Sequence, residues 1–283
     1  MKKIKIIGVP EHFNFPWTKA IADNKFSDKG INLEWTAIPE GTGRLNQMLR
    51  DGQTDMAIIL TEGIIKDILA GNHSKIVQIY VESPLIWGIH VDHNSPFETP
   101  ESLKDKIVAV SRFGSGSELM ARVHAHQMGW DNDRMQFEIV NTIEGAVTAL
   151  QNKSADYFMW EQFMTKPLVD QGIFRRVGVC PTPWPSFVIA VRDEVLENDT
   201  EAIRTVLNVI NNFTKNFKKE ENISTILSDT FNQNENDILE WMDLTTWSQS
   251  SMDESSLNKV QNELLELGII TKKGTFAEIV KAL

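Results

Sequence analysis

Short apolar segments alternate with helical patterns along most of the chain. The chain opens with an expected strand at 3–9, followed by a helix at 17–24, a strand at 31–38, a helix at 41–49 and a strand at 56–60. Parallel neighbours in a sheet need a crossover between them, and a helix is the usual crossover. The alternation therefore predicts an α/β fold in which each sheet is mostly parallel and is flanked by helices.

The alternation restarts after a polar stretch at 96–106. Two such cycles predict two lobes, with the chain crossing near 86–91 and returning near 187–191. We expect lobe one to comprise residues 1–88 and 189–283, and lobe two to comprise residues 89–188. Open α/β sheets bind ligands beyond the carboxyl ends of their strands, so a ligand cleft is expected between the lobes. The remaining expected elements are strands at 77–81, 107–110, 136–139 and 157–160 and helices at 64–70, 118–128, 144–151 and 163–171.

The last third of the chain has a helical pattern. Apolar residues between 202 and 217 fall on one face of a single helix, and apolar positions from 239 to 267 continue the pattern. We expect these extra C-terminal helices to return to lobe one.

Composition excludes several classes of function. The formal net charge of −11 opposes binding to nucleic acid, which requires a basic surface. The single cysteine, Cys180, excludes an intrachain disulfide and a cysteine-based metal or iron–sulfur site. His124 and His126 are two residues apart on an expected helix and face different directions. We therefore expect neither a metal nor a cofactor, and we expect a monomer.

The N-terminus has some features of a signal peptide. Two lysines precede an apolar stretch, but Lys5 interrupts that stretch and Pro10 ends it. An apolar core of about 7–15 residues and a small-residue cleavage site are missing. The sequence as given predicts a cytoplasmic protein, or a periplasmic one if it was cut from a secreted precursor. No segment reaches transmembrane length.

A Gly/Ser-rich turn joins the expected strand at 107–110 to a helix. Backbone N–H groups and the positive dipole at a helix N-terminus suit an anionic oxygen, and glycines let the backbone come close to it. The alternative is an ordinary capped turn. The turn lacks the third glycine of a dinucleotide fingerprint and the Gly-Lys-Ser/Thr end of a Walker A loop. The candidate ligand-binding residues of this turn are Ser111, Gly114, Ser115, Gly116 and Ser117.

Two further turns are candidates in lobe one. His12, Phe13 and Asn14 follow the first strand, where aromatic and amide groups suit a small polar organic ligand. Gly41 and Thr42 open the next helix, and we interpret them as the counterpart of the Gly/Ser turn. The alternatives are a surface loop with buried aromatics for the first turn and simple capping for the second.

Acidic and aromatic candidates complete the predicted site. Thr61 and Glu62 follow the strand at 56–60, Trp160 and Glu161 end the strand at 157–160, and Trp184 precedes the return crossing. Both carboxylates would accept hydrogen bonds from a ligand, and the aromatic rings would cover it. The alternatives are capping at 61–62, a salt-bridged surface acid at position 161, and stiffening of the crossing segment by Trp184.

Four motifs lie in order along the chain: KGINLE at 29–34, LRDGQTDMA at 49–57, ESLKDKIVAV at 101–110 and ALQNKSADY at 149–157. Together they resemble the type 2 periplasmic-binding-protein fold. They are most similar to the ABC-importer binding proteins for alkanesulfonates, taurine, nitrate and thiamin-pyrimidine precursors. Cytosolic relatives of this fold include fungal thiamin-pyrimidine synthases. That resemblance implies a cysteine-rich iron motif, which one cysteine cannot supply.

The resemblance favours a non-catalytic solute-binding protein that captures a small polar organic molecule by hinge closure, with an ABC permease as its partner. The alternative is a cytosolic enzyme on the same fold that acts on a small carboxylate or pyrimidine in cofactor biosynthesis. Glu62, Glu161 or His12 would then be its general acid or base. A regulatory ligand sensor is a third hypothesis.

Overall fold

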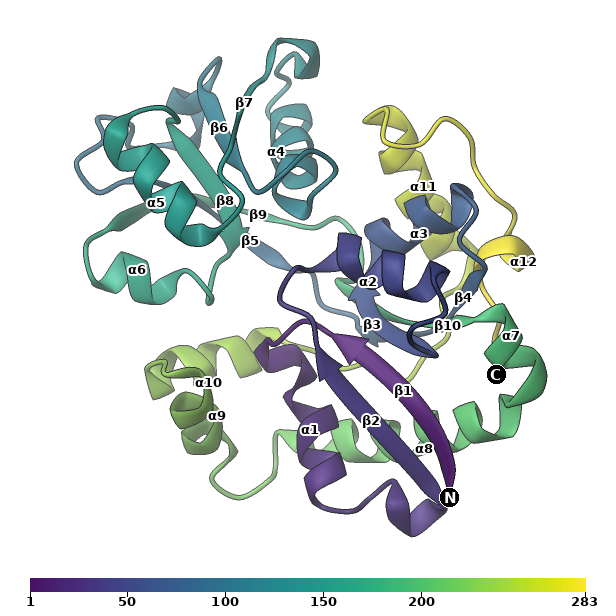
Figure 1. Ribbon diagram of the computed structural model, residues 1–283. Helices are drawn as coiled ribbons and strands as arrows, with labels where there is room; N and C mark the ends of the chain where they lie inside the picture. Colours follow the sequence, from purple (N-terminus) through teal and green to yellow (C-terminus); the bar gives the residue numbers. More distant parts are fainter. The chain divides into compact units, whose positions relative to one another are not determined.

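The computed structural model describes residues 1–283, which divide into two compact units (Figure 1). Unit one comprises residues 1–83 and 184–283, and unit two comprises residues 84–183. Each unit is built on a five-stranded sheet. The chain therefore passes from unit one to unit two once and returns once.

The sheet of unit one has the strand order β2-β1-β3-β10-β4. β1 is parallel to β2 and β3, whereas β10 is antiparallel to β3 and β4. Four strands therefore share one direction, and the returning strand β10 runs against them. The strand bounds are β1 (Lys2–Gly8), β2 (Ile31–Ala37), β3 (Met56–Leu60), β4 (Ser74–Val81) and β10 (Phe187–Arg192).

The sheet of unit two repeats this arrangement in the order β7-β6-β8-β5-β9. β6 is parallel to β7 and β8, and β5, the first strand after the crossing, is antiparallel to β8 and β9. The predicted mostly parallel sheets are confirmed as mixed sheets with one reversed strand each. The bounds are β5 (Ile86–Asp92), β6 (Ile107–Val110), β7 (Gln136–Ile139), β8 (Tyr157–Glu161) and β9 (Phe174–Pro181).

Helices follow the first three parallel strands of each unit. In unit one, α1 packs against the long helix α8 and β2, whereas α2 packs against α3 and β3. The connection from β1 to β2 and the connection from β2 to β3 run in opposite directions across the sheet. Right-handed crossovers therefore place the two groups of helices on opposite faces of the sheet. The bounds are α1 (Phe15–Ala22), α2 (Thr42–Arg50) and α3 (Thr61–Leu69) in unit one, and α4 (Gly116–Gln127), α5 (Ile143–Asn152) and α6 (Lys166–Asp170) in unit two.

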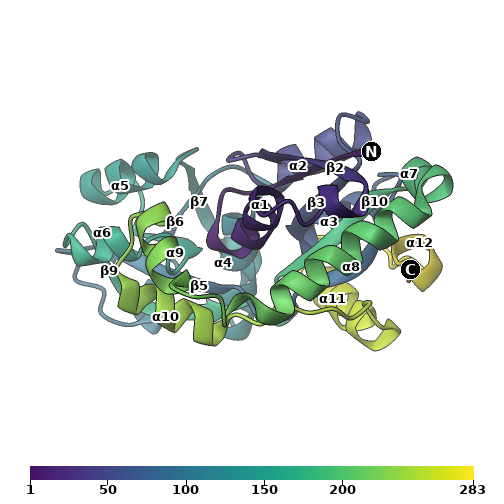
Figure 2. The ribbon, with the colours of Figure 1, turned by 90° about the horizontal axis from the view of Figure 1, so that it is seen from below.

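The C-terminal helices belong to unit one, as predicted. α8 (Thr200–Phe217) is amphipathic and buries Ile203, Val206, Ile210 and Phe217. Figure 2 shows it as one long helix that leads from α7 to the α9–α10 pair. No helix combines the length and the apolar character that a membrane crossing requires. The other helices are α7 (Asp193–Asn198), α9 (Ile223–Phe231), α10 (Glu235–Leu244), α11 (Glu254–Glu266) and α12 (Phe276–Ile279).

β4 begins at Ser74 rather than at 77, and several other bounds differ by one or two residues. Three further differences have local causes. α3 begins at Thr61 rather than at 64, directly after β3, although Gly63 lowers the helix propensity of its first turn. α6 covers only 166–170 instead of 163–171, because the backbone N–H groups of Phe163 and Met164 bond to the Glu161 carboxylate. β9 was not predicted, since Arg175, Arg176 and Gly178 interrupt its apolar alternation.

Candidate ligand-binding site

Parallel strands of one sheet end at a common edge, which we call the carboxyl edge of that sheet. In unit one, β1, β2 and β3 end there, and β10 begins there because Phe187 pairs with Leu60. In unit two, β6, β7 and β8 end at the equivalent edge. The segments that leave these strands are the edge turns: 9–14, 38–42 and 61–63 in unit one, and 111–118, 140–145 and 161–165 in unit two.

The structure places every predicted site residue in or beside an edge turn. His12, Phe13, Asn14, Gly41, Thr42, Thr61 and Glu62 lie in unit one, and Trp184 lies just before β10. Ser111, Gly114, Ser115, Gly116, Ser117 and Glu161 lie in unit two, and Trp160 ends β8 beside them.

One predicted correspondence is wrong. Because β6 occupies the place of β1, the counterpart of the Gly/Ser turn is the turn at 9–14 and not Gly41 with Thr42. Gly41 and Thr42 follow β2, so their counterpart follows β7, at Asn141 and Thr142. Sequence reasoning overlooked that turn, although Thr142 caps α5 by accepting a hydrogen bond from Gly145 N. The order of the strands in each sheet, rather than the composition of the turns, identifies which turns of the two units correspond.

The Gly/Ser turn of unit two satisfies many of its own hydrogen bonds. Ser117 Oγ accepts from Ser111 N at 3.0 Å and lies 3.0 Å from Ser115 Oγ. Ser115 Oγ caps α4 by accepting from Glu118 N at 3.3 Å. Ser115 therefore caps α4 and Ser117 bonds within the turn, as in an ordinary capped turn, and ligand binding by these serines stays a prediction.

A carboxylate of the chain itself stands at this helix N-terminus. Glu118 Oε2 accepts from Gly114 N at 2.6 Å, and Glu118 Oε1 accepts from Arg122 Nε at 3.0 Å and Arg122 Nη2 at 2.9 Å. Negative charge is favourable at the positive end of the helix dipole. Glu118 therefore takes a donor that an anionic ligand would otherwise use.

Glu161 has the same kind of role in the next turn of unit two. Its Oε2 accepts from Phe163 N at 2.9 Å and Met164 N at 2.8 Å, and the side chain is buried. Trp160, on the opposite face of β8, contacts the rings of Phe158 and Trp87. Glu161 thus shapes the turn before α6, and Trp160 is partly buried against the apolar core of unit two.

Glu62 in unit one has a different environment. Its side chain is 3% exposed, and Glu62 Oε2 accepts from Trp184 Nε1 at 2.8 Å. No cation pairs with it, so desolvation raises the pKa of this carboxyl to about 7. Thr61, its neighbour, donates from Oγ1 to Pro185 O at 2.6 Å, which ties the start of α3 to the segment before β10.

The turn at 9–14 is buried beneath the C-terminal helices. His12 Nε2 lies 3.0 Å from Gln233 Oε1, and the His12 ring lies 4.3 Å from the Phe231 ring and 5.0 Å from the Trp241 ring, centroid to centroid. Burial lowers the pKa of His12 to about 4, so the imidazole is neutral near pH 7. Phe13 packs against Phe187 and Trp241.

Three acceptor groups of this turn lack donors. Asn14 is 2% exposed and donates from Nδ2 to Val9 O at 2.9 Å, but its Oδ1 has no partner. His12 Nδ1 is likewise buried without a partner. Glu11 is half-buried, its side chain makes no hydrogen bond or ion pair, and desolvation raises its pKa to about 7. Sequence reasoning missed Glu11 because nothing in the local sequence reveals its burial.

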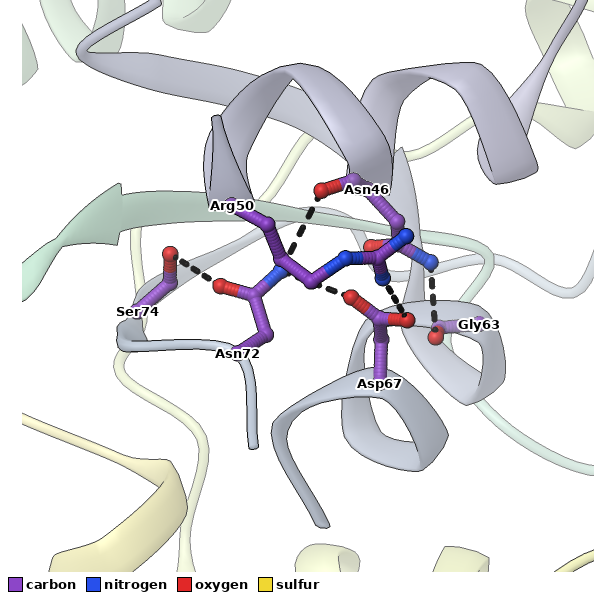
Figure 3. A network of polar contacts seen from close by, with 6 residues as sticks. All are labelled: Asn46, Arg50, Gly63, Asp67, Asn72 and Ser74. Carbon is purple, nitrogen blue, oxygen red and sulfur yellow. Dashed lines mark hydrogen bonds and ion pairs between the residues drawn. The ribbon is translucent and has the colours of Figure 1, made fainter. Parts of the chain in front are cut away.

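A polar network fixes the helices that carry the other unit-one turns (Figure 3). Asn46 of α2 donates from Nδ2 to Gly63 O of α3 at 3.1 Å, and Arg50 forms an ion pair with Asp67. Asn72 Nδ2 donates to Asp67 Oδ2 at 2.7 Å. Thr42 packs directly over Gly63, where a Cβ atom would lie 2.3 Å from Thr42 Cγ2. The close contact holds Thr42 next to the start of α3.

The chain forms two units, and the sheet of each unit has one reversed strand, which is the first strand after the chain enters that unit from the other. The C-terminal helices pack in the first unit. This arrangement defines the type 2 periplasmic-binding-protein fold. A family model described as "Ca3427-like PBP" matches residues 87–180, most of unit two. A comparison with curated proteins found no match.

Solved structures match the whole chain. The CA3427 gene product of Candida albicans, described as having the generic periplasmic-binding-protein fold, is 26% identical over 99% of this chain and 96% of its own, with a TM-score of 0.91. The alkanesulfonate-binding protein SsuA of Xanthomonas axonopodis pv. citri, bound to MOPS, is 12% identical over 100% and 99%, with a TM-score of 0.84. The ligand-binding component of an ABC-type import system from Staphylococcus aureus is 14% identical over 100% and 97%, with a TM-score of 0.77. Proteins of the same fold thus include a binding component of an ABC-type importer.

Proposed function

We propose that this protein is a solute-binding protein that captures a small polar organic molecule between its two lobes by hinge closure. The observation that carries the proposal is the repetition of the carboxyl edge: each sheet directs three turns toward one edge, and polar and aromatic residues gather there. Proteins of the same fold whose names describe solute binding support it. By analogy with the importer component, an ABC permease is the proposed partner.

Each candidate residue has a role in this proposal. Ser111, Ser115 and Ser117 would hold a carbonyl oxygen of the ligand, with the backbone of Gly114 and Gly116 close to it. Phe13, Trp160 and Trp184 would cover its flat or apolar part, and Glu62 or Glu161 would accept from its donors. His12, Asn14, Gly41, Thr42 and Thr61 would complete the unit-one wall.

A solute screen tests the proposal. Melting temperature is measured with amines, amino acids, carboxylates, sulfonates and pyrimidines, and one solute should raise it in a concentration-dependent manner. Small-angle scattering with that solute should show a smaller radius of gyration. Ser117→Ala should weaken the response, while Ser27→Ala, at an exposed serine, should not. A full panel without any stabilising solute would refute the proposal.

One observation favours the enzyme alternative. The pKa of about 7 at Glu62 and Glu11 suits a general acid or base near neutral pH. Under this hypothesis, the protein would convert a small carboxylate or pyrimidine rather than only bind it. Prolonged incubation of each binding solute, followed by mass spectrometry, separates the two functions: recovery of unchanged solute supports binding alone, and a new mass that disappears in Glu62→Gln supports catalysis.

A further inference from the structure

Each of the six edge turns contains one glutamate. The six are Glu11, Glu40, Glu62, Glu118, Glu144 and Glu161. The same segments contain a single basic residue, Arg112. Both carboxyl edges are therefore acidic, which is the opposite of what a strongly anionic solute requires.

In unit two these glutamates are satisfied within their own turns. Glu118 is bound by Gly114 N and Arg122, and Glu161 is bound by two backbone N–H groups. The Glu144 carboxylate accepts hydrogen bonds from its own backbone N–H and from Thr142, and these bonds lower its pKa. These carboxylates already hold the donors of their turns, so a sulfonate or carboxylate would compete with them for the same N–H groups.

In unit one, three acceptors of the turn at 9–14 are not satisfied. Within four residues, the Glu11 carboxyl, His12 Nδ1 and Asn14 Oδ1 all lack a donor. With His12 neutral and its Nε2–H donating to Gln233 Oε1, Nδ1 carries a lone pair. His12 is fully buried and Asn14 is 2% exposed, so each unmet acceptor carries a desolvation cost. A ligand with several N–H donors would remove that cost.

Glu62 lies in the neighbouring turn of the same edge. β1 and β3 are adjacent and parallel, with Ile7 beside Ala57, so the turns that follow them lie next to each other. The Glu62 carboxylate accepts from its own backbone N–H and from Trp184 Nε1, and it has no cation beside it. Glu62 is thus the second desolvated carboxyl in these two neighbouring turns.

Resting on the proposed function, we propose that the solute is a small organic cation rich in N–H groups, such as an amine or amidine. Its nitrogen end binds to Glu11, His12 and Asn14, with Glu62 beside them, and sulfonates are rejected. The class differs from the alkanesulfonate that the similar protein's name describes.

The test compares pairs of solutes that differ mainly in charge. Calorimetric titrations of the full chain at pH 7.5 and low salt use benzamidine with benzoate, and ethanolamine with 2-hydroxyethanesulfonate. We expect a cation to bind and its anionic match to show no heat of binding. Glu11→Gln and Glu62→Gln should each weaken the cation about tenfold, the effect of losing one charged hydrogen bond. Glu221→Gln, at an exposed glutamate outside the edge, should not.

The outcomes separate this inference from the function it rests on. Tighter binding of an anionic member overturns the ligand class and leaves solute binding intact. A cation whose affinity is the same in Glu11→Gln, Glu62→Gln and Glu221→Gln overturns the assigned residues. If neither the charged solutes nor the neutral members of the wider panel bind, both the ligand class and the solute-binding function are overturned. If a variant does not fold, the comparison of cationic with anionic solutes in the wild-type protein still tests the ligand class.

Discussion

The two units share one strand order but differ in how their edge turns are satisfied. In unit two, serine hydroxyls and the Glu118 and Glu161 carboxylates take up the backbone donors of their own turns. In unit one, Glu11, His12 and Asn14 leave acceptors without donors, and residues of α9 and α10 pack against His12. The same topology therefore produces one edge whose turns satisfy their own donors and one edge with buried acceptors that lack donors.

The difference indicates where ligand-binding energy would arise. A self-complete turn gains little from a ligand that must displace internal hydrogen bonds. A turn with buried unmet acceptors gains the full value of each new hydrogen bond, because the desolvation cost has already been incurred in the folded protein. Under the proposed function, the turns of unit one are thus expected to supply most of the ligand-binding energy.

The largest expected effect concerns the backbone of unit two. A Cβ atom at Gly145 would lie 2.0 Å from Val140 O, and a backbone oxygen cannot move cheaply. We expect Gly145→Ala to lower the free energy of unfolding by about 3 kcal/mol. Chemical denaturation measures this, and a loss below about 1 kcal/mol would show that the β7–α5 turn is less rigid than the comparison holds.

The substitution of an edge-turn glutamate by glutamine should have opposite effects on the free energy of unfolding in the two units. Folding raises the pKa of Glu62 from 4.5 to about 7, so the folded state binds more protons and its stability falls as pH rises from about 4.5 to 7. Glu62→Gln removes this loss. It should stabilise the protein by about 2–3 kcal/mol at pH 8 and by almost nothing at pH 4.

Glu118→Gln provides the matched variant in unit two. One of its side-chain positions would become an amide N–H₂ group that faces either Gly114 N or Arg122. We expect a destabilisation of about 1–2 kcal/mol at pH 8. Urea denaturation of both variants at pH 8 and pH 4 checks the pair. If both variants change the free energy of unfolding in the same direction at pH 8, the two edges do not differ as described.

A smaller effect is expected at the contact between α2 and α3 in unit one. Gly63→Ala places a methyl group against the Thr42 methyl and should destabilise the protein by about 1–2 kcal/mol. Thr42→Ser removes that methyl and should restore most of the loss in the double variant. Thermal unfolding of the four proteins measures the coupling. Additive effects would place Thr42 away from Gly63 in solution.

The smallest expected effect concerns the hydrogen bond to Glu62. Trp184→Phe removes the Nε1 donor and should cost about 1 kcal/mol at pH 8, where Glu62 is charged. In the Glu62→Gln background the cost should be lower, because a neutral acceptor binds the donor less strongly. A double-mutant cycle at pH 8 measures the coupling energy between Trp184 and Glu62. A coupling energy of zero would show that their hydrogen bond does not contribute to the stability of this edge.

Much of the fold could be predicted because it depends on local patterns. The strands at 56–60, 107–110 and 136–139 have the predicted bounds, since short apolar runs between turn residues specify them. β9 escaped prediction because a strand with two arginines and a glycine is specified by its pairing with β5. Tertiary partners, not local sequence, decide such elements.

The site was less predictable for the same reason. The sequence indicates which turns follow strands, so the candidates lie in or beside the edge turns. It does not reveal that Phe231, Gln233 and Trp241 bury His12, since they lie more than 200 residues away along the chain. The unmet acceptor at His12 Nδ1 depends on that burial.

Hydrogen exchange of the full chain, with and without the tightest-binding cation of the solute pairs, tests the central claim most directly. Peptides that cover 9–14 and 61–63 should gain protection at saturating solute, and they should gain more than peptides that cover 111–118. Protection of 111–118 without any change at 9–14 would contradict the account, because the Gly/Ser turn of unit two, and not the acceptors of unit one, would then hold the ligand.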